Sequence, residues 1–376
     1  MKRVASAILL CALLISPTTT TAQKLRGDYS QKGMSWVRTA SRIPDAFFTV
    51  YQDEAVRIAD NLVLYQLESG SWPKNVYFAA KLTEEQKKEV RAGKHKTESG
   101  TIDNGSTTTE IIYLSKVYNV TRDKKYKNAA LKAIRYILDA QYENGGWPQF
   151  YPNAQGYARH ITYNDDAMVN VMKILQDIFQ CNPLYWYADE SLRKEAKKAF
   201  DKGVECILRT QIVQNGRPTV WCAQHHYETF EPVKARSYEL PSLSGGESIG
   251  IVYLLMSIPD PSDEVIAAVD NAVAWFEASK IEGIRLEYYT DEEGKRDYRV
   301  VSSEHARPLW ARFYELDTNR PIFSDRDGVK KYNVSEIGHE RRTGYSWYNG
   351  NATALLEQYR IWKNSFRPDR RNRYSE

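Results

Sequence analysis

The sequence predicts a mainly α fold, an α/α toroid in which helical-hairpin repeats close into a barrel, with a smaller β-containing region. The first observation is a Gln-x-x-x-Gly-x-Trp element at residues 66–72, which returns at 141–147, 75 residues later. A degraded third copy spans 211–221. The second observation is an apolar pattern of helical period before each copy. A repeat of this length holds two helices, and stacked helical hairpins curve into a toroid.

Each copy of the element has the features of a helix end. Gly70 and Gly145 supply the left-handed backbone that stops a helix, and a proline directly after each Trp prevents its continuation. The Trp can pack on a neighbouring repeat, while the Gln can bond backbone groups at a facing helix end. We therefore expect structural roles for Gln and Trp. Lys74, exposed at the end of the first copy, is open to simple solvation or to ligand binding.

The apolar periodicity and the cap residues predict the helices in order, at 43–67, 105–118, 124–142, 164–180, 189–211, 245–257, 262–279 and 350–363. The heavily charged segment 81–99 is expected to form a solvated helix or insert over one end of the toroid. Two strands are expected at 285–289 and 297–301, and a shorter pairing of 322–323 with 332–334. The β-containing region is therefore placed around 283–349 of one catalytic domain, 23–376.

The first 22 residues have the features of a secretory signal peptide. Lys2 and Arg3 precede an apolar run over 4–15, and Ala22 ends a cleavage site of small residues. We therefore expect a secreted or periplasmic protein. No other stretch is long and apolar enough to span a bilayer, so no membrane association is expected after signal removal.

The composition limits the classes of partner. Loss of Lys2 and Arg3 lowers the formal net charge from +4 to +2, which argues against nucleic-acid binding. The 26 Tyr and nine Trp suit a sugar-stacking surface in an exported protein. A monomer is expected. Three cysteines remain after signal removal and allow at most one internal disulfide: Cys181, Cys206 and Cys222.

Two short acidic elements stand at the starts of equivalent helices. Asp103 and Asn104 precede one helix, and Asp165 precedes another, 62 residues after Asp103. This separation is close to the repeat length, so both elements are expected on the same rim of the toroid. Either one alone suits a helix cap, a role that Asp and Asn favour. Together, their carboxylate and amide oxygens form a hard-oxygen site suited to Ca²⁺.

Arginines gather near the C-terminus among aromatic residues, and Arg312, Arg326 and Arg341 are the predicted substrate-binding members. A guanidinium beside an aromatic face suits a sugar acid, because it can bind the carboxylate while the ring stacks. Surface ion pairs are the alternative for about half of the cluster. An earlier polar loop holds Lys234 and Arg236, which on an extended strand would face the same side and meet an anion.

Six longer strings are specific in composition. They stand at 101–110 (TIDNGSTTTE), 145–152 (GGWPQFYP), 161–168 (ITYNDDAM), 233–239 (VKARSYE), 323–328 (FSDRDG) and 341–348 (RRTGYSWY). In these strings the chain resembles the pectate lyases of the tenth polysaccharide-lyase family, over nearly the whole mature sequence. The resemblance implies a helical toroid with an added β region and dependence on Ca²⁺. It also implies cleavage of de-esterified polygalacturonate by β-elimination, which gives 4,5-unsaturated oligogalacturonates.

The resemblance also implies a role for each candidate residue. Asp103, Asn104 and Asp165 would hold a Ca²⁺ that also binds the substrate carboxylate. Arg236 would be the base that removes the C5 proton, although a guanidinium normally stays protonated. The remaining cations would hold neighbouring uronates or stabilise developing charge: Lys74, Arg312, Arg326 and Arg341.

Three other classes of protein stay open on the sequence. A glycoside hydrolase on a helical toroid would use two opposed carboxylates, and Asp103 with Asp165 can serve. A non-catalytic glycan-binding protein would keep the Arg and Tyr surface without a metal site. The Gln-x-x-x-Gly-x-Trp element also resembles the repeat of triterpene cyclases, but the export signal and the many charged residues argue against a lipid substrate. Calcium dependence with unsaturated products would distinguish the lyase from all three.

Overall fold

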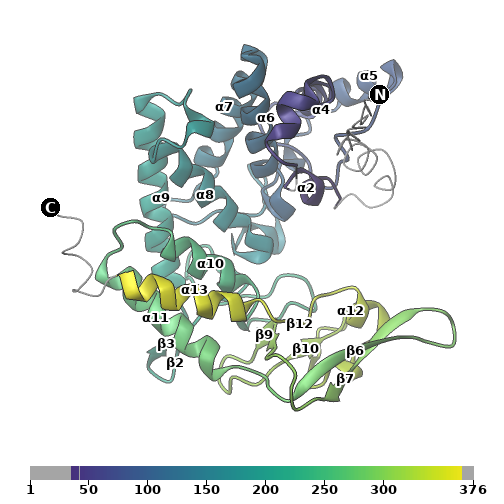
Figure 1. The fold of residues 1–376 in the computed structure, drawn as a ribbon, viewed down its shortest axis with the longest axis vertical. Coiled ribbons are helices and arrows are strands. Elements are labelled where there is room, and N and C mark those ends of the chain that lie inside the picture. The colour runs from purple at the N-terminus through teal and green to yellow at the C-terminus, as the bar shows by residue number, and fades with distance from the viewer. Residues whose placement is uncertain (1–34, 42, 366–376) are drawn as a thin grey trace, which may run out of the picture.

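The computed structural model describes residues 35–41 and 43–365 (Figure 1). The predicted signal peptide at 1–22 lies outside the described residues. Within the described part of the chain, no helix combines the length and the hydrophobicity needed to cross a bilayer. Helices dominate, and the strands are short except for one hairpin (Figure 1).

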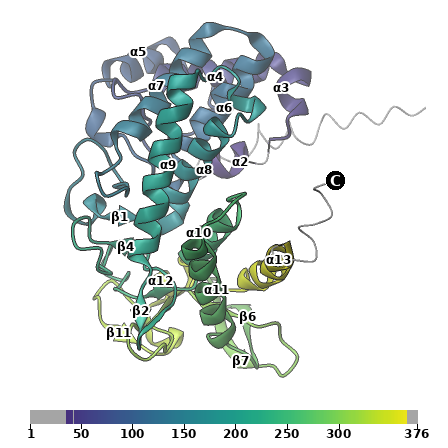
Figure 2. The ribbon, with the colours of Figure 1, turned by 90° about the vertical axis from the view of Figure 1, so that its left-hand side faces the viewer.

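Helical hairpins form the main part of the fold. Their helices are α4 Gln52–Tyr65, α6 Thr108–Thr121, α7 Lys124–Asp139, α8 Ala167–Phe179, α9 Glu190–Thr210, α10 Glu247–Met256, α11 Asp263–Ala278 and α13 Ala352–Ser365. Within the hairpins α6 packs on α7, α8 on α9 and α10 on α11, and α6, α8 and α10 also pack on one another in sequence. The hairpins therefore follow the curve of an α/α toroid, which confirms the predicted fold class (Figures 1 and 2).

Four shorter helices complete the helical part: α2 Ser35–Ala40, α3 Ala46–Val50, α5 Glu84–Ala92 and α12 His339–Thr343. The predicted helix at 43–67 is thus two helices, because Tyr51 leaves the helical conformation between α3 and α4 (φ −120°, ψ 47°). Helix α5 lies inside the charged segment 81–99 and none of its residues is buried, as expected for a solvated helix.

The predicted structural role of the Gln-x-x-x-Gly-x-Trp element is confirmed in all three copies. Each Gln Nε2 donates to a carbonyl of its own turn and to a carbonyl of the next hairpin, at 2.8–3.0 Å. Each Trp is fully buried, and its indole N–H donates to a carbonyl of the helix that the turn ends. The three Gln side chains therefore act as brackets that join consecutive hairpins, as follows: Gln66 to Gly70 and Ala129, Gln141 to Gly145 and Ala199, Gln211 to Thr219 and Ala268.

The β-containing region is built around one antiparallel hairpin, β6 Ile284–Thr290 and β7 Arg296–Ser302, as predicted. The second predicted pairing is displaced, because β10 Phe323–Ser324 pairs with β11 Lys330–Lys331 and Val334 opens a 3₁₀ turn. The remaining strands have two residues each: β1 Ile161–Thr162, β2 Val213–Gln214, β3 Arg217–Pro218, β4 Gln224–His225, β5 Leu243–Ser244, β8 Trp310–Ala311, β9 Phe313–Tyr314 and β12 Tyr348–Asn349.

This region has its own small hydrophobic core, separate from that of the helices. The core includes Tyr298 of β7, Phe323 of β10 and Trp347, together with Ala223 from the loop before α10. The β-containing region therefore also includes Ala223, which precedes the predicted range 283–349. In Figure 1 it lies below the hairpins α6/α7 and α8/α9, and beside α10, α11 and α13.

Candidate active site

Two 3₁₀ turns on neighbouring hairpins bring the predicted metal ligands together. Turn η2 Asp103–Gly105 precedes α6, turn η4 Asn164–Asp166 precedes α8, and the two turns pack on each other. Asn104 and Asp165 both adopt the left-handed conformation, each with φ 52°. Asn and Asp tolerate this conformation better than other side chains, and residues held there gather at functional sites.

The carboxylates of Asp103 and Asp165 do not act as helix caps. Helix α7 is capped by Asp123 and α9 by Asp189, each accepting a hydrogen bond from a backbone N–H of the first turn. The N-termini of α6 and α8 have no side-chain cap. The alternative of simple capping therefore fails for both turns, and their polar side chains are available for a ligand.

Asp103 is 2% exposed, and its two carboxylate oxygens have different surroundings. Oδ2 forms an ion pair with Lys74 Nζ, whereas Oδ1 is buried and has no hydrogen-bond partner among the described residues. Lys74 Nζ also lies 5.4 Å from the centre of the Phe150 ring. An orphaned carboxylate oxygen is costly to bury unless a cation or a donor meets it. Lys74 thus lies beside Asp103, the most buried of the predicted metal ligands.

Asp165 lies on the more open side of the same site. Its Oδ2 accepts from Asn164 Nδ2 at 2.8 Å, and its Oδ1 lies 3.5 Å from Arg312 Nη2. Partial burial raises the pKa of Asp165, an effect that Arg312 opposes. Among the described residues, no group of three or more His, Cys, Asp or Glu side chains is arranged to hold a metal ion. A metal at these turns would therefore use two carboxylates, the Asn104 amide and solvent or substrate oxygens, a donor set that suits a hard divalent cation.

Arg312 connects the turns to the β-containing region. Its Nη2 donates to Glu247 of α10 and, at 3.2 Å, to Asn164 Oδ1. Glu247 is 5% exposed and also accepts from Ser244. Burial lowers the pKa of Arg312, but the charge of Glu247 more than offsets this and the net pKa is raised. Arg312 is therefore held as a cation against turn η4, which carries the predicted metal ligand Asp165.

Three guanidinium groups surround the ring of Tyr345. Their central carbons lie 4.4 Å from the ring centre for Arg312, 5.6 Å for Arg341 and 5.8 Å for Arg236. The Tyr345 hydroxyl donates to Glu239 Oε1 at 2.8 Å. The predicted combination of arginine forks and aromatic faces is thus present at one place, next to Asp165.

Arg236 lies in a turn, not on the extended strand expected for 234–236, since Glu239 N donates to Arg236 O at 2.9 Å. Its guanidinium is gripped by Glu239, which accepts from Nε at 2.7 Å and from Nη2. Burial lowers the pKa of Arg236, but the hydrogen bond and charge of Glu239 more than offset this, so the net pKa is raised. In this arrangement Arg236 is firmly protonated.

Arg341 and Arg326 share one carboxylate but differ in exposure. Arg341 is 7% exposed, stacks at 4.4 Å over Tyr238 and donates to Glu340 at 2.9 Å. Arg326 is largely exposed and donates to the same Glu340 through two bonds of 3.1 Å. The predicted alternative of a surface ion pair therefore describes Arg326, and Arg341 is built into the site.

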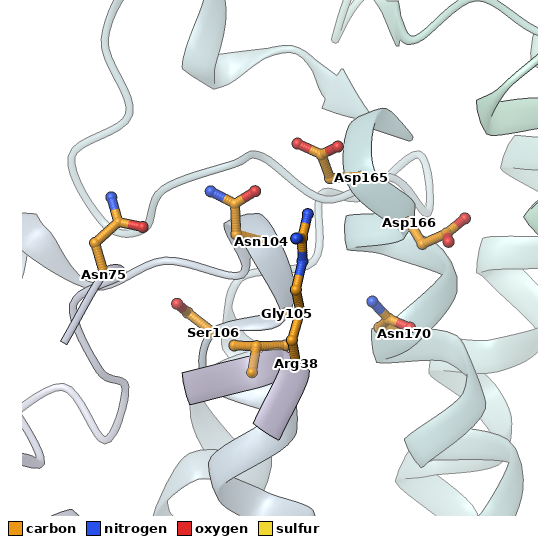
Figure 3. A pocket seen from close by; sticks show the side chains of 9 residues that line it. Arg38, Asn75, Asn104, Gly105, Ser106, Asp165, Asp166 and Asn170 are labelled. Atoms are coloured by element: carbon orange, nitrogen blue, oxygen red, sulfur yellow. The ribbon is translucent and has the colours of Figure 1, made fainter. Parts of the chain in front are cut away.

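A cavity of about 400 Å³ opens beside the turns η2 and η4, which carry the predicted metal ligands. Figure 3 shows it between η2, η4 and the helix α2, with side chains from all three. Burial raises the pKa of Asp166 to about 6. The lining residues are Val37, Arg38, Asn75, Asn104, Gly105, Ser106, Asp165, Asp166 and Asn170.

Sequence reasoning missed Glu239, Glu247 and Arg38. Glu247 opens a helix, where an acidic residue is ordinary, and a Glu three residues after an Arg has no distinctive meaning. Arg38 stands before the first repeat and outside every string that resembles the family. The three cysteines are free, with Cys181 exposed and Cys206 and Cys222 buried.

Comparison with known proteins gives a family and two solved structures. Residues 66–356 match the family model described as pectic acid lyase. The family 10 polysaccharide lyase from Cellvibrio cellulosa is 36% identical with a TM-score of 0.73, covering 88% of this chain and 96% of its own. A mutant of that lyase in complex with trigalacturonic acid is 35% identical with a TM-score of 0.72, covering 88% and 97%. The curated proteins give no match.

Proposed function

Because this chain belongs to the pectic acid lyase family and is a polysaccharide lyase, we propose that it cleaves de-esterified polygalacturonate by calcium-assisted β-elimination. The products are 4,5-unsaturated oligogalacturonates. The trigalacturonic acid bound by the related lyase supports an acidic polysaccharide as the substrate. The signal features at 1–22 support export, to the periplasm or beyond, as part of the same proposal.

The observation that best supports this chemistry is that the two acidic turns lie next to a group of arginines. Asp103, with its orphaned buried oxygen, and Asp165 lie on adjacent turns, and Arg312 reaches Asp165 from the β-containing region. Arg236 and Arg341 lie around the same tyrosine as Arg312. A polyanion crossing this place would meet a metal site on one side and fixed cations on the other.

The residues at the turns fit a calcium ion. Ca²⁺ held by Asp103, Asn104 and Asp165 would polarise the substrate carboxylate and so acidify the C5 proton next to it. Lys74 neutralises part of the charge of Asp103 through Oδ2 and leaves Oδ1 without a partner, so that this oxygen would be available to a cation. Arg312 and Arg341, both largely buried, are positioned to bind uronate carboxylates through preorganised guanidinium groups.

In the elimination, a base takes the C5 proton, the C–H electrons form the C4–C5 double bond, and the C4–O4 bond breaks. The departing oxygen then takes a proton from solvent. We propose Arg236 as the residue at the C5 proton, because it lies within electrostatic reach of Asp165 and beside Arg312 and Arg341. Since Glu239 holds it protonated, proton removal by Arg236 requires alkaline solution or a loosened Glu239 contact.

The test is ultraviolet absorbance of the purified protein on polygalacturonate with Ca²⁺, repeated with EDTA and with Arg236→Ala. We expect rising absorbance from the new double bond, lost in both repeats. Arg360→Ala, which changes an exposed arginine of α13, is the matched control and should keep full activity. New reducing ends without absorbance would identify a hydrolase, and the absence of both signals would point to another uronate substrate or to binding without catalysis.

A further inference from the structure

Helix α2 packs on α6 and covers one residue of the proposed metal-binding turn η2. Trp36 of α2 is 1% exposed, and its indole N–H donates to the buried Glu110 at 2.9 Å. Its ring packs edge-on against Phe78, with ring centres 5.7 Å apart. The next residue, Val37, covers Gly105, where an added Cβ would come within 2.9 Å of a Val37 methyl. These contacts fix the position of the following residue, Arg38, beside the turn.

Arg38 is a cation whose guanidinium has no hydrogen-bond or ion-pair partner within the described chain. Its side chain is exposed and lines the cavity next to Asn104 and Asp165 (Figure 3). The other arginines of the site are paired with carboxylates, as Arg236 is with Glu239 and Arg312 with Glu247. Arg38 is therefore the arginine at this site that a ligand can engage without breaking a protein ion pair.

The rest of the cavity offers groups that suit the hydroxyls of a sugar, and Arg38 is its one cation among the lining residues. Amide and hydroxyl groups of Asn75, Asn104, Ser106 and Asn170 line it, and such groups bond sugar hydroxyls. Its volume of about 400 Å³ is in the range of small-molecule sites. In Figure 3 the Asp166 carboxylate points away from Arg38. It lies against Gly250, where a Cβ added to the glycine would be 2.0 Å from Asp166 Oδ1.

From these observations, and resting on the proposed function, we propose that Arg38 binds the carboxylate of a galacturonate unit seated in the cavity between α2 and the metal-binding turns. Helix α2 lies ahead of residues 66–356, the part of the chain that matches the family. The site thus extends from the metal-binding turns to α2, opposite the arginines of the β-containing region. Substrate chains long enough to reach this cavity gain a charged contact that shorter chains lack.

The test compares wild type, Arg38→Ala and Arg38→Lys on galacturonate oligomers of increasing length. For Arg38→Ala we expect KM to rise about tenfold above a threshold length, with kcat unchanged, and no change below that length. Arg38→Lys should recover part of the loss because it restores the charge without the fork. Arg91→Ala on α5 removes another exposed arginine and should leave every length unaffected.

Binding measured by calorimetry separates this inference from the proposed function, because it needs no turnover. Oligogalacturonates should bind Arg38→Ala about tenfold more weakly than wild type, and the difference should vanish for methyl-esterified oligomers, which lack the carboxylate. An equal loss at all lengths, or none at any length, would overturn the role of Arg38. If no unsaturated product forms but Arg38→Ala still weakens binding, only the proposed function is overturned.

Discussion

At the scale of single residues, the Arg236–Glu239 pair would set the pH dependence of the proposed reaction. Glu239 raises the pKa of Arg236, so a neutral guanidine forms only at high pH. If Arg236 is the base, activity rises with pH as this group loses its proton. Glu239→Gln removes the negative charge, lowers that pKa, and should move the acid limb of the pH–rate profile to lower pH, with kcat reduced about tenfold by looser positioning.

Steady-state kinetics at fixed Ca²⁺ between neutral and strongly alkaline pH measure this shift. Tyr345→Phe supplies the comparison, since it removes the hydroxyl that donates to Glu239 but leaves the Arg236 contact in place. A profile of unchanged shape in Glu239→Gln would mean that Arg236 acts only as a bound charge and that another group takes the proton.

Glu110 makes the stability of the fold depend on pH. It is 1% exposed, and burial raises its pKa to about 7. Between about pH 4.5 and 7 the unfolded chain ionises this group while the folded chain keeps the proton, so stability falls as pH rises through this window. The loss amounts to roughly 3 kcal/mol and levels off above it.

Replacing this carboxyl with an amide removes its titration while keeping an acceptor for Trp36. Glu110→Gln should therefore match wild type near pH 4.5 and melt at a higher temperature at pH 8. Thermal unfolding at both pH values measures the difference, with the exposed Glu89→Gln of α5 as control. Parallel melting curves for Glu110→Gln and wild type across this range would contradict the prediction.

At the scale of elements, the Gln brackets account for how the hairpins stay in register. Gln141 Nε2 donates to Gly145 O at 3.0 Å and to Ala199 O at 2.8 Å. Gln141→Leu leaves both carbonyls unpaired and should destabilise the fold by about 1–3 kcal/mol. Gln141→Glu should cost more, because its carboxylate faces two carbonyl oxygens. Urea unfolding ranks the variants, with the exposed Gln358 of α13 changed in the same two ways. Equal stability of both Gln141 variants and wild type would show that the bracket is dispensable.

The helices were predictable because their ends have local chemical causes. Helix α9 is Glu190–Thr210 against a predicted 189–211, since Asp189 caps its start and the Gln211 bracket follows its end. The two-residue strands have no such cause. They form where loops from distant parts of the chain meet, as β5 does with β9, and two residues show no periodicity. The displaced register of β10 with β11 has the same origin.

At the scale of the whole molecule, the sequence supplied the residues of the site but not their pairing. The acidic elements at helix starts located Asp103 and Asp165, the arginine cluster located Arg312, and the fold brings them together across two hairpins and the β-containing region. The ion pairs of the arginines depend on packing between distant segments of the chain. The roles of Glu239 and Glu247 could therefore not be predicted from the sequence. Arg38 was missed because its position depends on how Trp36 packs, not on any local motif.

Because the proposed metal ligands belong to consecutive hairpins, a bound cation would link these hairpins and stabilise the whole fold. We expect saturating Ca²⁺ to raise the melting temperature by a few degrees, since binding at 100 times Kd contributes about 2.7 kcal/mol. Mg²⁺ should do less, because it demands a tighter octahedral geometry. Asp165→Asn should abolish the shift, whereas Asp201→Asn on the outer surface of α9 should keep it.

Arg312 already lies 3.5 Å from Asp165 and competes for it, so Arg312→Ala should strengthen the calcium shift even as it weakens catalysis. The wild-type melting temperature could stay unchanged by Ca²⁺ while activity requires Ca²⁺. This outcome would mean that the cation binds only together with the substrate, between the uronate carboxylate and the turns.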